Sequence, residues 1–364
     1  MTSRVVVRLK SSLDRSYTVT VRAGLLKELP GILARTWKGR RLFVITDANV
    51  RRLYGSPLLQ ALTALGSDAL LLDFPAGERS KNADVVFSLH SAILDQGIGR
   101  DSVILALGGG VVGDVAGFVA ATILRGVKYV QVPTTLLAQV DSSVGGKVGI
   151  DHAAGKNLIG SFHQPSAVFI DPLVLRTLPA AEFRSGLAEV VKIAAALDKP
   201  FFGRIERERK KILALHPGAL SALILRAVAL KSRVVAEDQF ETGLRKILNL
   251  GHTIGHALEA ASGYSMRHGE AVAAGMASEL HIAVMMGLLK PRDKERIVGL
   301  LKALKLRSRL PALRDRQRFS AALALDKKSE RGAPKFVLLR GIGHAVIGVE
   351  VPTPFIAEAV GVAR

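Results

Sequence analysis

The sequence predicts an α/β fold, with an N-terminal domain built on a Rossmann-like parallel sheet and a mainly α-helical C-terminal domain. Up to about residue 172, short apolar runs alternate with segments of helical periodicity, a pattern typical of parallel strands joined by crossover helices. From about residue 178 onward the periodicity is helical. A length of 364 residues also fits about two domains, so we expect domains at 1–177 and 178–364.

In the first half, apolar runs and periodic segments follow one another in order. The segment 41–47 is an apolar run that ends in polar residues, and the end of such a strand is where α/β sheets bind ligands. Strands are expected at 5–9 paired with 17–22, and at 41–47, 69–74, 102–107 and 128–133. Helices are expected at 53–65, 83–96 and from the glycines near 110 to residue 124.

The second half is expected to be helical, with a short β-like region at its end. The segment 182–192 reads as an amphipathic helix that carries Glu189 and Lys192 on one face. Apolar periodicity returns at 271–289, and the β-like runs are 336–340 and 345–349.

The composition is that of a globular protein, with 49% hydrophobic and 23% charged residues. The chain has no cysteine, which fits a reducing cytoplasm. Residues 1–10 lack the apolar core of a signal peptide, and no apolar run approaches the roughly 18 residues of a spanning helix. We therefore expect a soluble, cytoplasmic protein without a membrane partner.

The net charge of +20 raises the possibility of nucleic-acid binding, since basic proteins release counterions from phosphates. Much of the excess lies in 204–211 and 290–318, where basic residues are mixed with apolar residues at helical spacing, as on solvated helix faces. Aromatic residues make up only 5%, and no nucleic-acid-binding motif is present. Specific nucleic-acid binding is not expected.

Three histidines in the second half can meet at one point. His252 and His256, four residues apart, share one helix face, and His268 begins the next periodic segment. Without cysteine, a divalent ion needs His, Asp or Glu ligands, which Zn²⁺ accepts, and Glu189 is our candidate from elsewhere in the chain. The alternative is that these histidines bond to carbonyls on a helix face, since the Glu of an HExxH motif is missing.

A glycine-rich turn follows the expected strand 102–107. Residues 108–114 read GGGVVGD, which satisfies GxGxxG, and backbone N–H groups at such a turn can hold a pyrophosphate. The acidic residue expected about 20 positions later is absent, so a close-packing turn is an alternative. Lys147 and Lys156 lie in what we expect to be glycine-rich loops, 141–147 and 155–157, where lysines suit phosphate recognition or simple surface exposure.

Six long, ordered blocks of sequence are spread over most of the chain: GGGVVGD at 108–114, QVPTTLLAQVDSSVGGK at 131–147, GKNLIG at 155–160, SGLAEVVK at 185–192, ETGLRKILNLGHTIGH at 241–256 and HGEAVAAG at 268–275. Taken together, these blocks resemble the 3-dehydroquinate synthase family. The resemblance implies an NAD-binding N-terminal domain and a metal- and substrate-binding C-terminal domain.

The resemblance also assigns roles to individual residues. It implies that a divalent metal, zinc or cobalt, is bound by Glu189, His252 and His268. The implied catalytic residues are His256, which transfers protons, and Lys147, Asn157 and Glu241. The implied NAD contacts are Asp47, Asn49, Glu78, Lys81, Gly109, Gly110, Asp114, Thr134, Thr135, Lys147, Lys156 and Thr177. The implied substrate contacts are Arg125, Asp141, Lys147, Lys156, Asn157, Lys192, Lys231, Arg245, Asn249, His256 and Lys327.

The implied activity is a phosphate-eliminating carbon–oxygen lyase of the shikimate pathway of aromatic amino acid biosynthesis. It would convert 3-deoxy-D-arabino-heptulosonate 7-phosphate to 3-dehydroquinate by transient oxidation with NAD, phosphate elimination, re-reduction, ring opening and aldol closure. The resemblance further implies a homodimer. Other sugar phosphate cyclases that make cyclitols are the alternative. Metal-dependent polyol dehydrogenases are a more distant one, against which Glu189 speaks.

Overall fold

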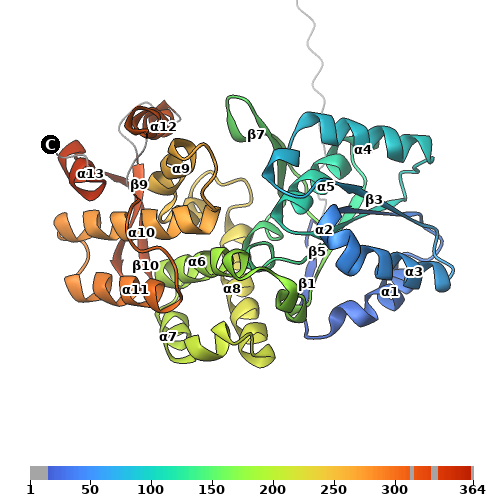
Figure 1. The fold of residues 1–364 in the computed structure, drawn as a ribbon, viewed down its shortest axis with the longest axis horizontal. Helices are drawn as coiled ribbons and strands as arrows, with labels where there is room; N and C mark the ends of the chain where they lie inside the picture. The colour runs from blue at the N-terminus through green and yellow to red at the C-terminus, as the bar shows by residue number, and fades with distance from the viewer. Residues whose placement is uncertain (1–14, 312–314, 329–334, 362–364) are drawn as a thin grey trace, which may run out of the picture.

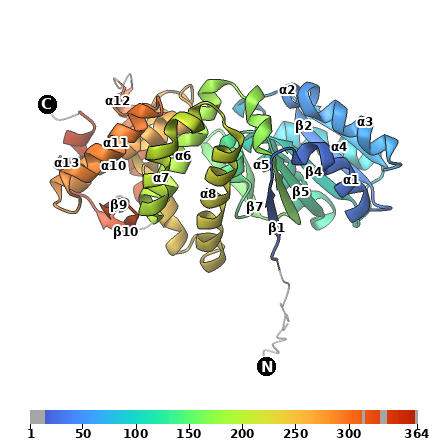
Figure 2. The ribbon, with the colours of Figure 1, turned by 90° about the horizontal axis from the view of Figure 1, so that it is seen from below.

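The structure is a computed structural model that describes residues 15–311, 315–328 and 335–361, with the backbone alone at 324–328. Figures 1 and 2 show two halves side by side along the long axis: an α/β half around a parallel sheet, and a helical half that begins with the helix Ala180–Leu197. The predicted fold class is confirmed. The expected strand at 5–9 lies outside the described residues.

A parallel sheet of six strands in the order β1-β8-β5-β4-β2-β3 forms the centre of the α/β half. The strands are β1 (Thr18–Val21), β2 (Leu42–Asp47), β3 (Ala69–Phe74), β4 (Val103–Gly108), β5 (Lys128–Pro133) and β8 (Ala167–Ile170). The central strand β4 is buried along its whole length, as expected for a strand with both faces covered. The expected strands 41–47, 69–74, 102–107 and 128–133 are therefore confirmed.

Helices cover both faces of this sheet. α1 (Leu25–Thr36) and α3 (Ser56–Ala64) pack on one face, and α4 (Ala83–Asp95) and α5 (Gly110–Thr122) pack on the other. The short helical segments are α2 (Ala48–Val50), η1 (Arg51–Gly55), η2 (Glu78–Ser80), η3 (Ile123–Arg125), η4 (Ala138–Ser142) and η5 (Pro172–Thr177). Helix formation thus begins at residue 48, earlier than the 53–65 expected from periodicity.

The prediction that Lys147, Lys156 and Asn157 lie in glycine-rich loops is wrong. They lie on an antiparallel hairpin of β6 (Lys147–His152) and β7 (Gly155–Phe162), which projects near the boundary of the two halves (Figure 1). Gly149 pairs with Gly160, and a Cβ at either position would lie within 2.5 Å of a carbonyl oxygen of the other strand. Gly149 and Gly160 therefore serve close strand pairing. Gly145 and Gly146, with φ of +105° and +66°, do lie in a loop, just before β6.

The helical half extends from α6 to the C-terminal end of the described chain. Its helices are α6 (Ala180–Leu197), α7 (Lys199–Leu213), α8 (Pro217–Glu237), η6 (Leu244–Asn249), α9 (His252–Ala261), α10 (His268–Met285), α11 (Pro291–Ala303), α12 (Arg316–Lys328) and α13 (Thr353–Ala359). The predicted terminal β region is confirmed as an antiparallel pair, β9 (Lys335–Gly341) and β10 (His344–Glu350).

One hydrophobic core joins the helical half to strand β8 of the sheet. Val168 and Ile170 of β8 belong to the same buried cluster as α6, α8, α9 and α10. The domain boundary at residue 178 stays a prediction. Among the described residues, no helix combines the length and apolarity needed to span a bilayer.

Candidate functional site

Three helices of the helical half bring Glu189, His252 and His268 together. Their candidate ligand atoms all lie within 4.8 Å of one another. The Nε2 atoms of His252 and His268 lie 3.8 and 3.3 Å from Oε1 of Glu189. Both carboxylate oxygens of Glu189 are buried and accept no hydrogen bond from the described residues, although the Lys192 ammonium lies beside one of them. Two imidazoles and one carboxylate fit a divalent metal such as Zn²⁺ or Co²⁺ and leave a position open.

The charges around this group also suit a metal. Burial alone would raise the pKa of Glu189, but the Lys192 ammonium and the two imidazoles hold it well below its usual range. Burial and the Lys192 charge lower the pKa of His252, which keeps its imidazole neutral. Burial opposes protonation of His268, yet the carboxylates of Glu189 and Glu259 raise its pKa to about 10. Metal binding at neutral pH would therefore displace a proton from His268.

A close crossing of α9 and α10 fixes the two candidate metal ligands His252 and His268. A Cβ at Gly275 of α10 would lie 2.2 Å from the carbonyl oxygen of Gly251, so only glycine permits this approach. Gly251 has a φ of +82° and precedes α9 without a side-chain cap of its own. Instead, buried Glu279 of α10 accepts the backbone N–H groups of Gly251 at 2.5 Å and Ile254 at 3.3 Å. A carboxylate at a helix N-terminus also complements the helix dipole.

His256 lies one turn beyond His252 on α9 and is exposed. Its ring centroid is 5.1 Å from that of His252 and 6.3 Å from that of His268. The imidazole thus borders Glu189, His252 and His268, called here the metal-ligand group because they could hold a metal, without belonging to it. This position suits transfer of a proton to or from a bound molecule.

A cation cluster lies next to the metal-ligand group and consists of Lys147, Lys192, Lys231 and Arg245. The Lys231 ammonium donates to the backbone carbonyl of Asp141 at 2.7 Å and pairs with its carboxylate. Lys147 pairs with Glu241, whose other carboxylate oxygen accepts from Asn249 at 3.1 Å. Three of the four cations are less than 6% exposed. Several cations close together in a buried setting suit the binding of a ligand with several negative charges.

The hairpin contributes Lys156 and Asn157, and both are tied to neighbouring acidic or polar groups. Asn157, at a φ of +57°, accepts from Lys81, which also pairs with Asp114 at 2.6 Å. Lys156 lies 3.4 Å from Glu78. The hairpin residues and the predicted NAD contacts Glu78, Lys81 and Asp114 therefore form one connected group.

The glycine turn lies at the carboxyl ends of β4 and β5. α5 begins at Gly110, and its N-terminus has no side-chain cap, so its first N–H groups can bind an anion. Thr134 donates its backbone N–H to Gly108 at 2.8 Å, and a Cβ at Gly109 would lie 2.9 Å from the methyl group of Thr135. This geometry fits a nucleotide pyrophosphate.

Asp47, Asn49 and Thr177 flank the same edge of the sheet. Asp47 ends β2 and accepts the backbone N–H groups of Asn49 and Val50 at 2.9 and 3.0 Å. Thr177 is exposed at the end of η5, and its hydroxyl lies 2.7 Å from that of Tyr54, a residue not predicted from the sequence.

Two predicted substrate contacts are not brought to the site by the described chain. Arg125 is exposed at the far end of α5 from the glycine turn, with a φ of +66°. Lys327 lies on α12, and its side chain is outside the described residues. Both assignments stay predictions.

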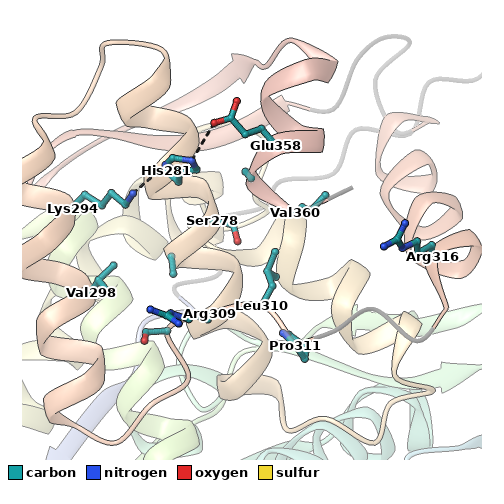
Figure 3. Close-up of a pocket in the computed structure, with 14 residues that line it drawn as sticks. Ser278, His281, Lys294, Val298, Arg309, Leu310, Pro311, Arg316, Glu358 and Val360 are labelled. Atoms are coloured by element: carbon teal, nitrogen blue, oxygen red, sulfur yellow. Dashed lines mark hydrogen bonds and ion pairs between the residues drawn. The ribbon is translucent and has the colours of Figure 1, made fainter. Parts of the chain in front are cut away.

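A separate cavity of about 570 Å³ lies between α10, α11 and α13 (Figure 3). Within it, His281 lies 3.0 Å from the Lys294 ammonium and 3.7 Å from the Glu358 carboxylate. None of the predicted metal, NAD or substrate contacts lines this cavity, so we do not place the reaction there.

Glu259 of α9 was not predicted from the sequence, yet it contacts two predicted site residues, His268 and Lys156. Its spacing of seven residues from His252 places both on one helix face, which was the available signal.

Two family models match the chain. The model described as 3-dehydroquinate synthase N-terminal matches residues 71–185, and that described as 3-dehydroquinate synthase C-terminal matches residues 186–329. The curated 3-dehydroquinate synthase of Acidithiobacillus ferrooxidans is 46% identical over 346 residues, covering 95% of this chain and 94% of that protein.

Two solved structures share the fold. The 2-epi-5-epi-valiolone synthase of Streptomyces hygroscopicus subsp. jinggangensis 5008, with NAD⁺ and Zn²⁺ bound, has a TM-score of 0.90 and 32% identity, covering 98% of this chain and 99% of that one. A 2-deoxy-scyllo-inosose synthase complexed with carbaglucose-6-phosphate, NAD⁺ and Co²⁺ has a TM-score of 0.85 and 27% identity, covering 94% and 95%.

Proposed function

The chain belongs to the 3-dehydroquinate synthase family, and we propose that it converts 3-deoxy-D-arabino-heptulosonate 7-phosphate to 3-dehydroquinate and inorganic phosphate. The conversion breaks a carbon–oxygen bond, closes a six-membered carbocycle and involves no net oxidation, so the protein is a lyase. The observation that carries the proposal is the meeting of Glu189, His252 and His268 beside the cation cluster.

We propose that Glu189, His252 and His268 hold a divalent metal and that the N-terminus of α5 holds the NAD pyrophosphate. When bound, these groups supply Lewis acidity at a substrate hydroxyl and a reversible acceptor for the hydride of its carbon. Lys81 and Asp114 pair beside the turn and would position the nucleotide. Asp47, which ends β2, and Asn49 of α2 would contact its adenosine side.

The cation cluster would bind the two anionic groups of the substrate. A phosphate and a carboxylate together carry more charge than one lysine can balance, and the cluster supplies several cations in a largely buried setting. Lys156, on the hairpin, would hold the leaving phosphate and favour its departure by stabilising developing negative charge.

Proton transfers would fall to the side chains that border the bound substrate. His256 is exposed beside the metal-ligand group and is not one of the three proposed ligands. Glu241, at a φ of +58°, is held by Lys147 and Asn249. These residues would move protons at the substrate while the imidazoles of His252 and His268 stay in place.

The experiment is a comparison of substrates, made before and after metal removal. Phosphate release and carbocycle formation are expected with the heptulosonate phosphate, loss of both after chelation, and recovery with Zn²⁺ or Co²⁺. Turnover of sedoheptulose 7-phosphate, which lacks the carboxylate, with inertness toward the heptulosonate would instead support a cyclitol synthase. Full activity of protein shown by elemental analysis to be metal-free would contradict the metal assignment.

We also propose that the enzyme is a cytoplasmic homodimer. The absence of cysteine fits a reducing compartment, and the family resemblance supports a dimer. Light scattering on the eluting protein should give twice the chain mass of 38.8 kDa, and a monomeric mass would contradict the dimer.

A further inference from the structure

Glu259 is a buried carboxylate with two partners from different parts of the chain. It lies on α9 and is only 2% exposed. Its Oε2 atom lies 3.4 Å from Nδ1 of His268, and its Oε1 atom accepts from the Lys156 ammonium at 3.2 Å. Burying a carboxylate costs folding free energy unless it is paired, and here each of the two oxygens has a partner.

The two nitrogens of His268 face opposite carboxylates. Nε2 lies 3.3 Å from Glu189, toward the metal-ligand group, while Nδ1 lies toward Glu259. The His252 ring has the same orientation: its Nε2 faces Glu189, and its Nδ1 lies 3.3 Å from the carbonyl oxygen of Leu250. Metal-bound histidines usually donate their second N–H to a carboxylate or carbonyl, which fixes the tautomer and raises ligand basicity.

We propose that Glu259 is a positioning residue: it orients His268 for metal binding through Nε2 and connects this ligand to Lys156 of the hairpin. This inference rests on the proposed function, since it presupposes the metal at Glu189, His252 and His268. Lys156 also lies 3.4 Å from Glu78 and 4.9 Å from the centre of the Tyr264 ring. One carboxylate thus joins a metal ligand of the helical half to a phosphate-binding candidate of the α/β half.

The same carboxylate could instead bind a second ion, because candidate ligand atoms of His256, Glu259 and His268 lie within 4.8 Å of one another. The partners of Glu259 argue against this: Oε1 accepts from Lys156 and Oε2 faces Nδ1 of His268, so both oxygens are already engaged. Both oxygens of Glu189, in contrast, accept no hydrogen bond from the described residues. We therefore expect one metal ion per chain.

The test measures Zn²⁺ affinity by competition with a chromophoric chelator, in the unmodified protein and in Glu259→Gln. The substitution should weaken metal binding about 10- to 100-fold, the range found when such outer partners are removed. It should also shift the visible absorption of bound Co²⁺, because the basicity of His268 changes. Elemental analysis should give one ion per chain in both proteins.

Asp198→Asn is the matched control, because it removes another buried carboxylate of the helical half. Asp198 is the N-cap of α7 and pairs with Arg226, and neither contact involves a proposed metal ligand. It should lower thermal stability but leave the Zn²⁺ affinity and the Co²⁺ spectrum unchanged. Glu259→Asp, with its carboxylate withdrawn by one methylene, should shift both metal readouts in the same direction as Glu259→Gln and serves if the glutamine variant does not fold.

Each remaining outcome overturns the inference in a distinguishable way. Unchanged Zn²⁺ affinity and spectrum in the Glu259 variants would contradict the positioning role alone. Two ions per unmodified chain, falling to one in Glu259→Gln, would make Glu259 a ligand. Failure of both variants to fold would assign it to fold stability. An unmodified protein that binds no metal would instead contradict the proposed function itself.

Discussion

Lys147 is half-exposed on the hairpin, next to other cations. Partial burial, together with the charges of Arg245 and Lys231, lowers its pKa to about 8. A lysine with a lowered pKa is charged below that pH and loses its charge above it, so anion binding should weaken on the alkaline side. We expect kcat/KM for the heptulosonate phosphate to fall as the pH rises through about 8.

Lys147→Arg tests this assignment, because arginine keeps its charge over the whole working range. In a pH profile of kcat/KM, the alkaline decrease should move to higher pH or disappear. An unchanged decrease in the arginine variant would show that another group titrates there.

His256 and His252 are one turn apart, but their substitution should have different effects on metal content and on kcat. His256→Ala should retain the metal and lose about 10²- to 10⁴-fold in kcat, the usual contribution of a positioned acid or base. His252→Ala should lose the metal, because its Nε2 faces Glu189. Elemental analysis beside steady-state kinetics checks both, and loss of metal from His256→Ala with intact substrate binding would mean that the roles are reversed.

At the scale of single elements, the crossing of α9 and α10 should be the part of the site that tolerates substitution least. Gly275→Ala would place a Cβ 2.2 Å from the Gly251 carbonyl and 2.7 Å from the Gly255 nitrogen, both backbone atoms. The helices must separate, which should cost about 1–3 kcal/mol of unfolding free energy. The histidines on these helices would then move apart, so Zn²⁺ affinity should also fall.

Gly299→Ala in α11 is the control for this prediction. A Cβ at Gly299 meets no atom within 4 Å, so alanine should stabilise the helix by about 0.5–1 kcal/mol through its better propensity. Urea denaturation of both variants gives the comparison. Equal stability of the two would contradict the close-contact explanation.

The elements differ in how far the sequence determines them in advance. β2 and β4 were predictable because strands buried on both faces are continuous apolar runs. The β6–β7 hairpin was not, because glycines at 145, 146 and 155 suggest loops, and the close pairing of Gly149 with Gly160 is known only once the strands meet. The sequence blocks shared with the family predicted most residues of the candidate site. The proposed role of Glu259, in contrast, follows only from its contact with His268 in the folded chain.

At the scale of the whole molecule, the net charge of +20 still permits nonspecific contact with nucleic acid. Some surface cations are already paired, as in Arg296 of α11 with Glu206 of α7 at 2.6 Å. We expect DNA binding to be weak, independent of sequence and lost as salt increases, because it would rest on phosphate contacts alone. Nanomolar, sequence-selective binding at physiological salt, measured by fluorescence anisotropy, would contradict a purely enzymatic role.

The two halves contribute different parts of one reaction, the cofactor and the metal-bound substrate. The α/β half offers the nucleotide turn, and the helical half offers the metal ligands and most of the cation cluster. A substrate held between them would give up a hydride and regain it before release. NAD⁺ would then be needed only in catalytic amounts, unlike in a dehydrogenase.

The most direct measurement follows phosphate release and NADH absorbance together while the enzyme consumes 3-deoxy-D-arabino-heptulosonate 7-phosphate. We predict one phosphate per substrate molecule consumed, while NADH never exceeds the enzyme concentration. NADH accumulating in proportion to substrate consumed, or formed stoichiometrically with glycerol or glycerol 1-phosphate, would contradict a synthase and indicate a dehydrogenase.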